Sequence, residues 1–538
     1  MNKNCKQCGA EFEITDSDLK FYDKISPVIA GKRQSVPEPT FCPDCRMQRR
    51  FAFRNERNLY KRKSDLSGKE IVTCYHPDEN VKVYEQDEWW GDKWEGCDFG
   101  MDYDFNKRFF EQFDELQKKV PMIALHTVNN QNSQYVNYTG ECKDCYMIFG
   151  PVYSEDCLYG SPYYSKNCID SLLVRDSQFC YQCITCEKCY QCFFSQDCVN
   201  SDDLSFCYDC HGCSDCIACT GLRNKKHQIF NKQYTPEDYE EKKKMLDFSS
   251  MEQLENISRK FKDQKLHVPR RYSVEVSTEN CTGNYIYQSK TSNDCYDVQR
   301  AWDCRYLAQT IDTKDCCDCN YTEENELAYE YMGYYRDVHC MFSIVCANSS
   351  DVFYSAYCMS CKNCFGCIGL RHKEYCILNK QYAKDEYEEL LPKIIEKMRR
   401  HGEWGEYFPI KISPFCYNET VANEYFPLSE EEAIKRGFRW RQKDKRDYQK
   451  PHGDVLACAS CGKNYKLQKA EEIFYKRYHL PSPEKCPDCR HIKRLSMRPP
   501  RKLWDRECSN CKKSIRSSYS PNQPEIIYCD ECYLKQTY

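Results

Sequence analysis

Small or apolar side chains recur at every third position through two central segments, and bulky or charged residues fill the positions between them. The first segment runs from Ser165 to Cys219, and the second, with one interruption, from Ser289 to Cys367. A fixed short period over such a length predicts a repeating coil, a β-solenoid, whose third residues point inward. In the first segment these residues are Ser165, Cys168, Ser171, Val174, Ser177, Cys180, Cys183, Cys186, Cys189, Cys192, Ser195, Cys198, Ser201, Leu204, Cys207, Cys210, Cys213, Cys216 and Cys219.

The inward positions could be either a packed core or a set of metal ligands. Cys180-x-x-Cys183-x-x-Cys186 matches part of an iron–sulfur motif. However, Val and Ala, which cannot coordinate a metal, occupy the same frame, and small buried side chains suit a narrow interior. We therefore favour a packed core over a metal cluster or a disordered metallothionein-like chain. The pattern resembles the tight right-handed β-helices of insect antifreeze proteins, a resemblance that implies about twelve residues per coil.

Two irregularities and one duplication modify this picture. Asn325, Tyr331, Tyr334 and Asp337 interrupt the second segment, where we expect a loop or a widened coil. The earlier residues Cys142, Cys145, Ser154 and Cys157 are out of phase with Cys168, which predicts a coil of irregular length. A shift of 148 residues superimposes the two segments, for example Cys210 on Cys358 and Cys219 on Cys367, so the second solenoid is a copy of the first.

The outward positions carry two further signals. Asp or Asn directly before an inward Cys, as at Asp156, Asn167, Asp197, Asp294 and Asp315, suits a corner, because these residues tolerate a left-handed backbone. Tyr and Phe crowd other outward positions, and we expect them to stack in ladders along the coils; an aromatic binding surface is the alternative.

Helical patterns connect these parts. Residues 102–120 predict an amphipathic helix with Phe105, Phe109, Phe113 and Leu116 on one face, which we expect to pack against the end of the first solenoid. Thr235-Pro opens a charged helical linker over 236–265, a second helix follows over 384–400, and Ser429 begins a short one.

The most specific chemistry lies near the two ends of the chain. Paired Cys-x-x-Cys turns can hold one ion between four sulfurs, and thiolates in that geometry select Zn²⁺, with iron as competitor. Three such sites, and so three structural zinc ions, are expected; disulfides or redox-active pairs are the alternative. The predicted ligands are Cys5, Cys8, Cys42 and Cys45; Cys458, Cys461, Cys486 and Cys489; and Cys508, Cys511, Cys529 and Cys532.

A second duplication predicts a fourth ribbon without metal. A shift of 444 residues places Cys42 on Cys486 and Tyr75 on Tyr519. The four ligands of the last site then fall on Ser64, Ser67, Glu85 and Glu88, so all four thiolates are replaced together. We expect a ribbon that keeps its fold and has lost its zinc.

Basic segments follow the first ribbon at each end, over 46–63 and 490–502. Clustered cations among aromatic residues could contact phosphates and stack on bases. Two alternatives remain open: a solvated helix face, or pairing with acidic residues elsewhere in the chain. The candidate nucleic-acid contacts are Arg49, Arg50, Arg54, Arg57, Arg494 and Arg498.

The expected fold is mainly β with helical connectors: two tight parallel β-helix solenoids flanked by terminal zinc ribbons. The predicted order is a zinc ribbon with a basic tail (1–63), a degenerate ribbon (64–100), a helical connector (101–132), solenoid 1 (133–234), a helical linker (235–272), solenoid 2 (273–382), a helix and connector (383–450), and two zinc ribbons (451–503 and 504–538).

Composition agrees with several small domains. The 538 residues include 43 Cys and 43 Tyr, so thiols and rings carry an unusual share of the burial, and the net charge is only −4. The N-terminus lacks the apolar core of a signal peptide, and we find no stretch resembling a membrane span. We expect a cytoplasmic protein; a secreted disulfide scaffold is disfavoured by the odd number of cysteines.

The order of motifs, CxxC, CPDCR-x-x-RR, RNER-x-LYKR, two Cys-triplet regions and a terminal CPDC ribbon, resembles an uncharacterised bacterial family of cysteine-rich zinc-ribbon proteins. The resemblance spans essentially the whole chain. Some similar proteins carry an automatic CoA-transferase label of the CaiB/BaiF type, but this sequence has neither a doubly wound βαβ pattern nor an identifiable nucleophilic Asp.

These observations favour a non-enzymatic zinc-binding scaffold that docks through its basic ribbons onto RNA, DNA or a nucleoprotein complex. A protein-assembly module that uses the solenoid faces is the second hypothesis, and a thiol-rich metal buffer or redox protein the third. The sequence identifies no catalytic residue, no small-molecule substrate and no membrane partner.

Overall fold

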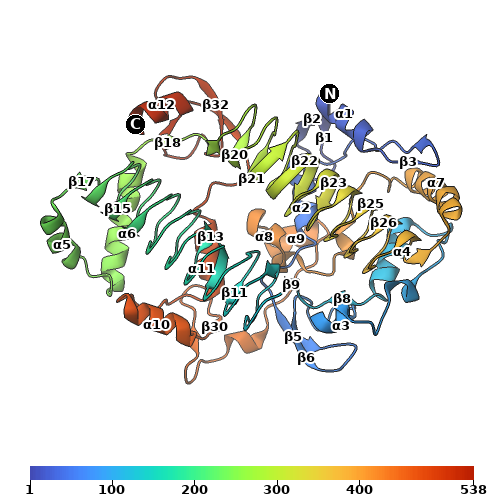
Figure 1. Ribbon diagram of the computed structural model, residues 1–538, viewed down its shortest axis with the longest axis horizontal. Helices are drawn as coiled ribbons and strands as arrows, with labels where there is room; N and C mark the ends of the chain where they lie inside the picture. Colours follow the sequence, from blue (N-terminus) through green and yellow to red (C-terminus); the bar gives the residue numbers. More distant parts are fainter. Residues whose placement is uncertain (538) are drawn as a thin grey trace. The chain divides into compact units, whose positions relative to one another are not determined.

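The computed structural model describes residues 1–537 and divides them into two compact units. Unit 1 contains residues 1–125, 273–441 and 501–503, and unit 2 contains residues 126–272, 442–500 and 504–537. Each unit has one solenoid of stacked parallel strands, which Figure 1 draws as a row of coils, and ribbons from a chain end. The predicted fold class is confirmed.

Solenoid 1, in unit 2, advances by twelve residues per coil. Tyr146 pairs with Leu158, and Asp202 with Ser214, both in parallel. One coil is shorter, because Glu155 bridges to Lys166, which is the irregular coil predicted before Cys168. Its strands are β9 (Thr127–Val128), β10 (Thr139–Gly140), β11 (Tyr146–Ile148), β12 (Leu158–Tyr163), β13 (Leu172–Arg175), β14 (Asp202–Ser205), β15 (Ser214–Ile217), β16 (Lys226–Ile229) and the closing antiparallel β17 (Lys232–Gln233).

Each coil is built from three-residue steps with one backbone pattern. Cys183 is fully buried, Ile184 bridges to the neighbouring coils, and Thr185 has a φ of 52°. The third residue of each step therefore lies in the left-handed region, where Asp and Asn are enriched among non-glycine residues. The predicted corner residues share this conformation: Asp156, Asn167, Asp197, Asp294 and Asp315 have φ between 52° and 55°.

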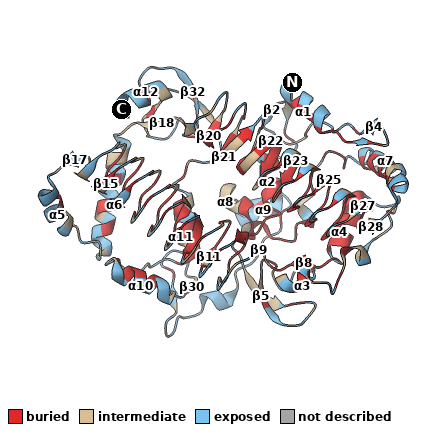
Figure 2. Cartoon of the chain, viewed as in Figure 1, coloured by how far each residue is buried: buried red, intermediate tan, exposed pale blue. Residues whose placement is uncertain are grey.

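The thiols fill the interior and satisfy backbone carbonyls. Cys183 Sγ lies 3.1 Å from the carbonyl oxygen of Cys192, which is nine residues ahead and so one three-residue step short of a full coil. Burial raises the pKa of Cys198 and Cys207 far above the ordinary thiol value, which keeps these groups protonated and unreactive. Within residues 1–537, groups of three or more potential metal ligands occur at the three terminal tetracysteine sites. The inward residues thus form the packed core that the sequence favoured, as Figure 2 shows in red along the coils.

Solenoid 2, in unit 1, is a ten-stranded sheet in which nine parallel strands are closed by one antiparallel strand, β28. The register stays at twelve residues where an interruption was expected, since Glu326 pairs with Val338. The strands are β19 (Glu275–Val276), β20 (Gly283–Tyr287), β21 (Cys295–Trp302), β22 (Ala308–Asn320), β23 (Glu326–Met332), β24 (Val338–Met341), β25 (Ser350–Phe353), β26 (Lys362–Phe365), β27 (Glu374–Ile377) and β28 (Lys380–Gln381).

The expected loop in this solenoid is therefore wrong, and a buried polar network takes its place. Asn325, Tyr331 and Asp337 keep the inward frame and are at most 1% exposed. Tyr331 Oη lies 2.7 Å from Asp337 Oδ2 and 3.1 Å from the carbonyl oxygen of Cys346. The large ring fits because Gly333 has no side chain: a Cβ there would lie 2.0 Å from the Tyr331 ring.

Aromatic side chains stack between successive coils, as expected for ladders. The Phe194 and Phe206 rings lie 4.6 Å apart and nearly parallel, and Phe342 and Tyr354 lie 4.7 Å apart. These distances match the spacing of neighbouring strands. Helices cover part of each ladder, since Phe206 packs with Phe261 of α6 (Met251–Leu266).

The remaining elements of unit 1 are short. They comprise β1 (Asn2–Asn4), β2 (Glu11–Glu13), α1 (Asp16–Ile25), β3 (Val28–Ile29), β4 (Lys32–Arg33), α2 (Pro43–Phe51), β5 (Tyr60–Lys63), β6 (Glu70–Thr73), β7 (Val83–Tyr84), α3 (Gln86–Trp90), α4 (Phe109–Gln117), β8 (Met122–Ile123), α7 (Lys384–Arg400), α8 (Val421–Tyr425) and α9 (Glu430–Lys435).

Unit 2 adds α5 (Pro236–Lys244), α6, β18 (Arg270–Arg271), β29 (Leu456–Ala457), β30 (Asn464–Tyr465), α10 (Lys469–Arg477), α11 (Pro487–Leu495), β31 (Trp504–Glu507), β32 (Ser514–Ser517), β33 (Ile527–Tyr528) and α12 (Asp530–Thr537). The linker helices thus appear where they were predicted, and Thr235 and Ser429 cap α5 and α9. Among residues 1–537 we find no helix with the length and apolar character that a membrane crossing needs.

The amphipathic helix α4 departs from the prediction in two ways. It begins only at Phe109, so Phe105 lies outside it and is 41% exposed. It also packs against solenoid 2 rather than solenoid 1: the Phe109 ring lies 5.2 Å from Phe365 and 5.4 Å from Tyr354. The chain order misled the prediction, because residues 1–125 form one unit with the second solenoid.

The buried network of solenoid 2 predicts a measurable pH effect. Burial raises the pKa of Asp337 from 3.8 to about 7, so between these values the folded chain holds a proton that the unfolded chain has lost. Stability should therefore fall as pH rises through this window. We expect Asp337→Asn, whose amide needs no proton, to remove that part of the slope in urea unfolding measured from about pH 5 to pH 8. An unchanged slope would contradict the assignment.

Candidate metal centres and the helices they anchor

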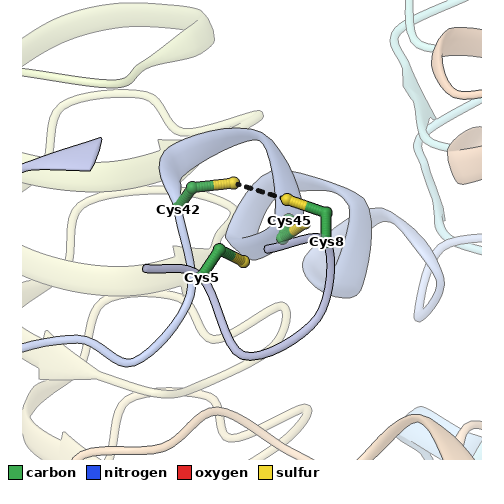
Figure 3. A group of neighbouring side chains, drawn as sticks. All are labelled: Cys5, Cys8, Cys42 and Cys45. Carbon is green, nitrogen blue, oxygen red and sulfur yellow. Dashed lines mark hydrogen bonds between the residues drawn. The ribbon is translucent and has the colours of Figure 1, made fainter. Parts of the chain in front are cut away.

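The first tetracysteine site brings together residues from two separate turns. Cys5 and Cys8 come from the β1–β2 hairpin, and Cys42 and Cys45 from the start of α2 (Figure 3). The four sulfur atoms lie within 4.8 Å of one another, and Cys8 Sγ is 3.7 Å from Cys42 Sγ. Sulfurs around a tetrahedral ion with metal–sulfur bonds of about 2.3 Å lie about 3.8 Å apart. The arrangement of the four sulfur atoms is therefore compatible with a single bound metal ion.

The other two predicted sites have the same form. Cys458, Cys461, Cys486 and Cys489 converge at the start of α11, and Cys508, Cys511, Cys529 and Cys532 at the start of α12. One sulfur–sulfur distance in each is 3.8 Å and 3.6 Å, respectively. All twelve predicted ligands are thus brought together in the three expected groups of four. All 43 cysteines lie in the described part of the chain, and all are free thiols there.

Backbone donors prepare two of these thiols for metal binding. Burial raises the pKa of Cys458, but N–H groups of Cys486 and Cys461 outweigh it and lower the pKa to about 6. The pKa of Cys508 is also about 6, because N–H groups of Cys511 and Cys529 outweigh burial. The thiolate is the form that binds a metal ion.

The fourth ribbon has the predicted fold without cysteines at the four ligand positions. Strands β5, β6 and β7 match β31, β32 and β33 residue for residue at the 444-residue shift. Ser64 N–H bonds to the carbonyl oxygen of Lys69 at 2.8 Å, as Cys508 N–H bonds to that of Lys513 at 2.9 Å. Glu88 occupies the position of the last ligand and accepts a hydrogen bond from the Ser64 hydroxyl. Serine–carboxylate hydrogen bonds thus replace the metal, and the ribbon begins at Tyr60, before the predicted boundary at residue 64.

Helix α2, which begins at the first tetracysteine site, packs against solenoid 2. Cys42 is its N-cap residue, and Pro43 and Asp44 follow in the first turn, an arrangement that favours helix initiation. Arg46 and Arg50 are four residues apart, so they share one face of the helix. Both guanidinium groups reach Asp318, at 2.7 Å and 3.1 Å, and Arg50 also pairs with Glu330 at 2.5 Å.

This contact is fully buried. Arg50 and Asp318 are 0% exposed, and Arg46 only 2%. Burial alone would raise the pKa of Asp318, but Arg46 and Arg50 hold it below its ordinary value. A neighbouring pair joins Arg49 to Glu406 at 2.9 Å. The acids of the solenoid and of the segment after α7 thus neutralise the basic helix.

Helix α11 repeats the contact in unit 2. Arg490 and Arg494, the counterparts of Arg46 and Arg50, lie 3.3 Å and 3.0 Å from the carboxylate of Asp170. Asp170 is 0% exposed and precedes Asp318 by the 148 residues that separate the two solenoids. The ribbon and its acidic partner were therefore duplicated together, and both copies kept the contact.

Of the six arginines proposed for nucleic-acid contact, five are at most 8% exposed: Arg49, Arg50, Arg54, Arg494 and Arg498. Arg57 is partly exposed. Arg54 pairs with Glu56 at 2.6 Å and lies over the Tyr321 ring. Pairing with acidic residues of the chain, one of the alternatives left open by the sequence, therefore accounts for Arg49, Arg50, Arg54 and Arg494. The acids were missed because Asp170 and Asp318 occupy left-handed corner positions, where Asp is common for backbone reasons.

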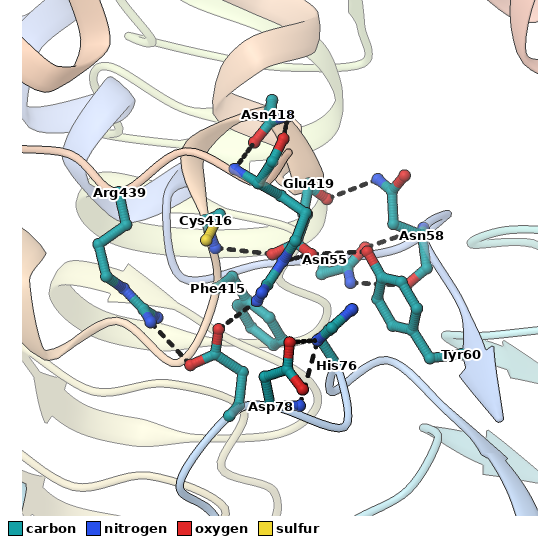
Figure 4. Close-up of polar contacts among 12 residues, drawn as sticks. Asn55, Asn58, Tyr60, His76, Asp78, Phe415, Cys416, Asn418, Glu419 and Arg439 are labelled. Atoms are coloured by element: carbon teal, nitrogen blue, oxygen red, sulfur yellow. Dashed lines mark hydrogen bonds and ion pairs between the residues drawn. The ribbon is translucent and has the colours of Figure 1, made fainter. Parts of the chain in front are cut away.

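A polar cluster attaches the fourth ribbon to residues 410–441 of unit 1 (Figure 4). Glu419 is its centre: the carboxylate accepts hydrogen bonds from Tyr60 Oη at 2.6 Å and Arg441 Nε at 3.0 Å. Arg439 pairs with Glu79 at 2.7 Å. The metal-free ribbon is thus held in place by charge as well as by packing.

Comparisons with known proteins identify neither a family nor a function for this chain. A scan against protein-family models gave no match, and neither did a search of curated proteins. Solved structures that match include a putative acetyltransferase from Desulfovibrio desulfuricans G20, with 11% identity over 48% of this chain and 68% of that chain and a TM-score of 0.11. So low a TM-score supports no statement about fold or function.

We expect Arg50→Ala to destabilise unit 1 by about 3–5 kcal/mol, because it leaves buried carboxylates without part of their counter-charge. Urea unfolding and hydrogen exchange of α2 would measure the loss. The exposed Lys63→Ala is the matched control and should stay within about 0.5 kcal/mol of the parent protein. Equal effects of the two changes would contradict the structural role of Arg50.

Restoring the four cysteines should restore the missing site. In the variant S64C/S67C/E85C/E88C the backbone is already arranged as in the last ribbon, so we expect one additional metal ion per chain by elemental analysis. The double variant S64C/S67C supplies only half the ligands and should gain none. An unchanged metal content in the quadruple variant would show that the two turns are not equivalent.

Proposed function

We propose that this protein is a non-enzymatic scaffold in which three Zn²⁺ ions anchor terminal ribbons onto two β-solenoids. One observation carries the proposal: two of the three tetracysteine sites lie at the start of a helix whose arginines are buried against a solenoid carboxylate. A structural ion that orders the ribbon thereby orders the docked helix. Four thiolates in tetrahedral geometry favour zinc, and Fe²⁺ is the main competitor.

Metal and thiol counts test this directly. We expect three zinc ions per chain, one for each group of four cysteines, and 43 titratable thiols once the chain is unfolded in the presence of a chelator. Chelation should unfold the three cysteine ribbons and leave residues 60–90 protected from hydrogen exchange. More than three metals would favour the thiol-rich buffer, and equal loss of protection in all four ribbons would contradict the proposal.

Docking onto RNA, DNA or a nucleoprotein is the finer proposal. In the basic segment 46–63 the exposed cations are Lys61 and Lys63, so these are the residues to reverse in a gel-shift experiment. We expect the shift to weaken with salt and with K61E/K63E. Reversal of buried Arg49 or Arg50 would disturb the fold instead. If the nucleic acid still binds at high salt and to K61E/K63E, docking through this basic segment is excluded.

The proposal places the protein in the cytoplasm, where thiols stay reduced. One observation supports this: all 43 cysteines lie within the described residues 1–537, and none of them forms a disulfide there. Membership of the bacterial zinc-ribbon family rests on the order of motifs given above.

A further inference from the structure

The two ribbon helices differ at one surface, formed in unit 1 by Gln48 and Arg49 of α2 together with Phe53, which lies just beyond the end of the helix. In unit 1 this face of α2 is covered: Gln48 is 3% exposed and donates to Tyr417 Oη at 2.7 Å, and Phe53 is 3% exposed and packs on Tyr407. Residues 403–438, the cover segment, supply these contacts. They also supply Glu406, which pairs with Arg49.

In unit 2 the corresponding face of α11 is open. The 444-residue shift places Gln48 on Ile492, Arg49 on Lys493 and Phe53 on Met497. Ile492 is 60% exposed and Met497 43%, although both are apolar. The same helix surface that is buried in one copy is therefore presented to solvent in the other.

The charge around the open face is positive. Lys493 is exposed and lies near the cations Lys262, Lys485 and Arg494, with Glu255 as the opposing charge. In unit 1 the cation at this position has a carboxylate partner from the cover segment. The open face is thus exposed and bordered mainly by cations, whereas its copy in unit 1 is covered by apolar side chains and pairs with Glu406.

We propose that the open face of α11 (Ile492, Lys493 and Met497) docks a short, acidic, amphipathic segment of a partner protein. The cover segment shows the chemistry that fits such a face. Its residues 403–432 combine buried aromatic rings with seven carboxylates and one lysine: Glu403, Glu406, Glu419, Glu424, Glu430, Glu431 and Glu432, with Lys411. Apolar contacts would supply affinity, and the carboxylates would pair with Lys493 and its neighbours.

A peptide of residues 403–432, labelled with fluorescein and carrying Cys416→Ser, is a direct probe. We expect it to bind the zinc-loaded full-length chain in fluorescence anisotropy, more weakly as salt increases. Ile492→Glu should weaken binding at least tenfold, and Lys493→Glu should weaken it while abolishing most of the salt dependence. A scrambled peptide of the same composition is the control.

The same variants show which outcomes overturn the proposal. If the scrambled peptide binds as tightly as the original, or if the original peptide binds the Ile492→Glu variant as tightly as the parent chain, the open face is not the binding site. If single-stranded RNA binds the parent chain and the Ile492→Glu variant but not the Lys493→Glu variant, the open face is a nucleic-acid surface and the proposal is wrong. If the parent chain self-associates in sedimentation experiments and the Ile492→Glu variant does not, the open face binds a second copy of this chain instead. Thermal destabilisation by Ile492→Glu would show that the chain itself covers the face.

Discussion

A buried guanidinium–carboxylate contact links the first tetracysteine ribbon of each unit to the solenoid of that unit, and the architecture of both units depends on it. Transfer of a charge from water to a protein interior costs several kcal/mol unless a partner compensates it. Arg46 and Arg50 compensate Asp318, and Arg490 and Arg494 compensate Asp170. Removal of either side would leave the other charged and buried. The contact therefore fixes the position of the tetracysteine ribbon on the solenoid.

The solenoid interior imposes a second constraint. A coil of twelve residues has about four inward positions, and most are filled by Cys, Ser, Thr or a small aliphatic side chain. A thiol suits this space because it is nearly apolar and still donates weakly to a carbonyl, as Cys183 does. Where solenoid 2 admits Tyr331, it needs the absent side chain of Gly333 and a hydrogen-bonded Asp337. Size and hydrogen bonding, rather than coordination, explain the choice of cysteine.

The sequence predicted the features that depend on spacing alone. Cys-x-x-Cys pairs identified all twelve metal-site ligands, and the 444-residue shift located the fourth ribbon through Ser64 and Glu88. Features set by distant contacts were not predictable in the same way. Asp318 looks like any corner aspartate until α2 is placed against it, and Phe109 gives no sign of which solenoid it will contact. The basic segments were correctly singled out, but their partners lie in parts of the chain far removed in sequence.

These long-range contacts were hard to predict because the ribbons and solenoids occur in a different order in the two units. The same difference in order explains why only one of the two ribbon helices is covered. In unit 1 the ribbons precede their solenoid, whereas in unit 2 they follow it. The same arginine–aspartate contact forms in both orders, so the contact rather than the connectivity defines the unit. Residues 403–438 follow the second solenoid and cover the helix of their own unit, where Gln48 donates a hydrogen bond to Tyr417 Oη. Its counterpart Ile492 kept an apolar side chain on an uncovered face. Two copies that share a tetracysteine site and an anchor thus differ at one helix surface, which is covered in unit 1 and exposed in unit 2.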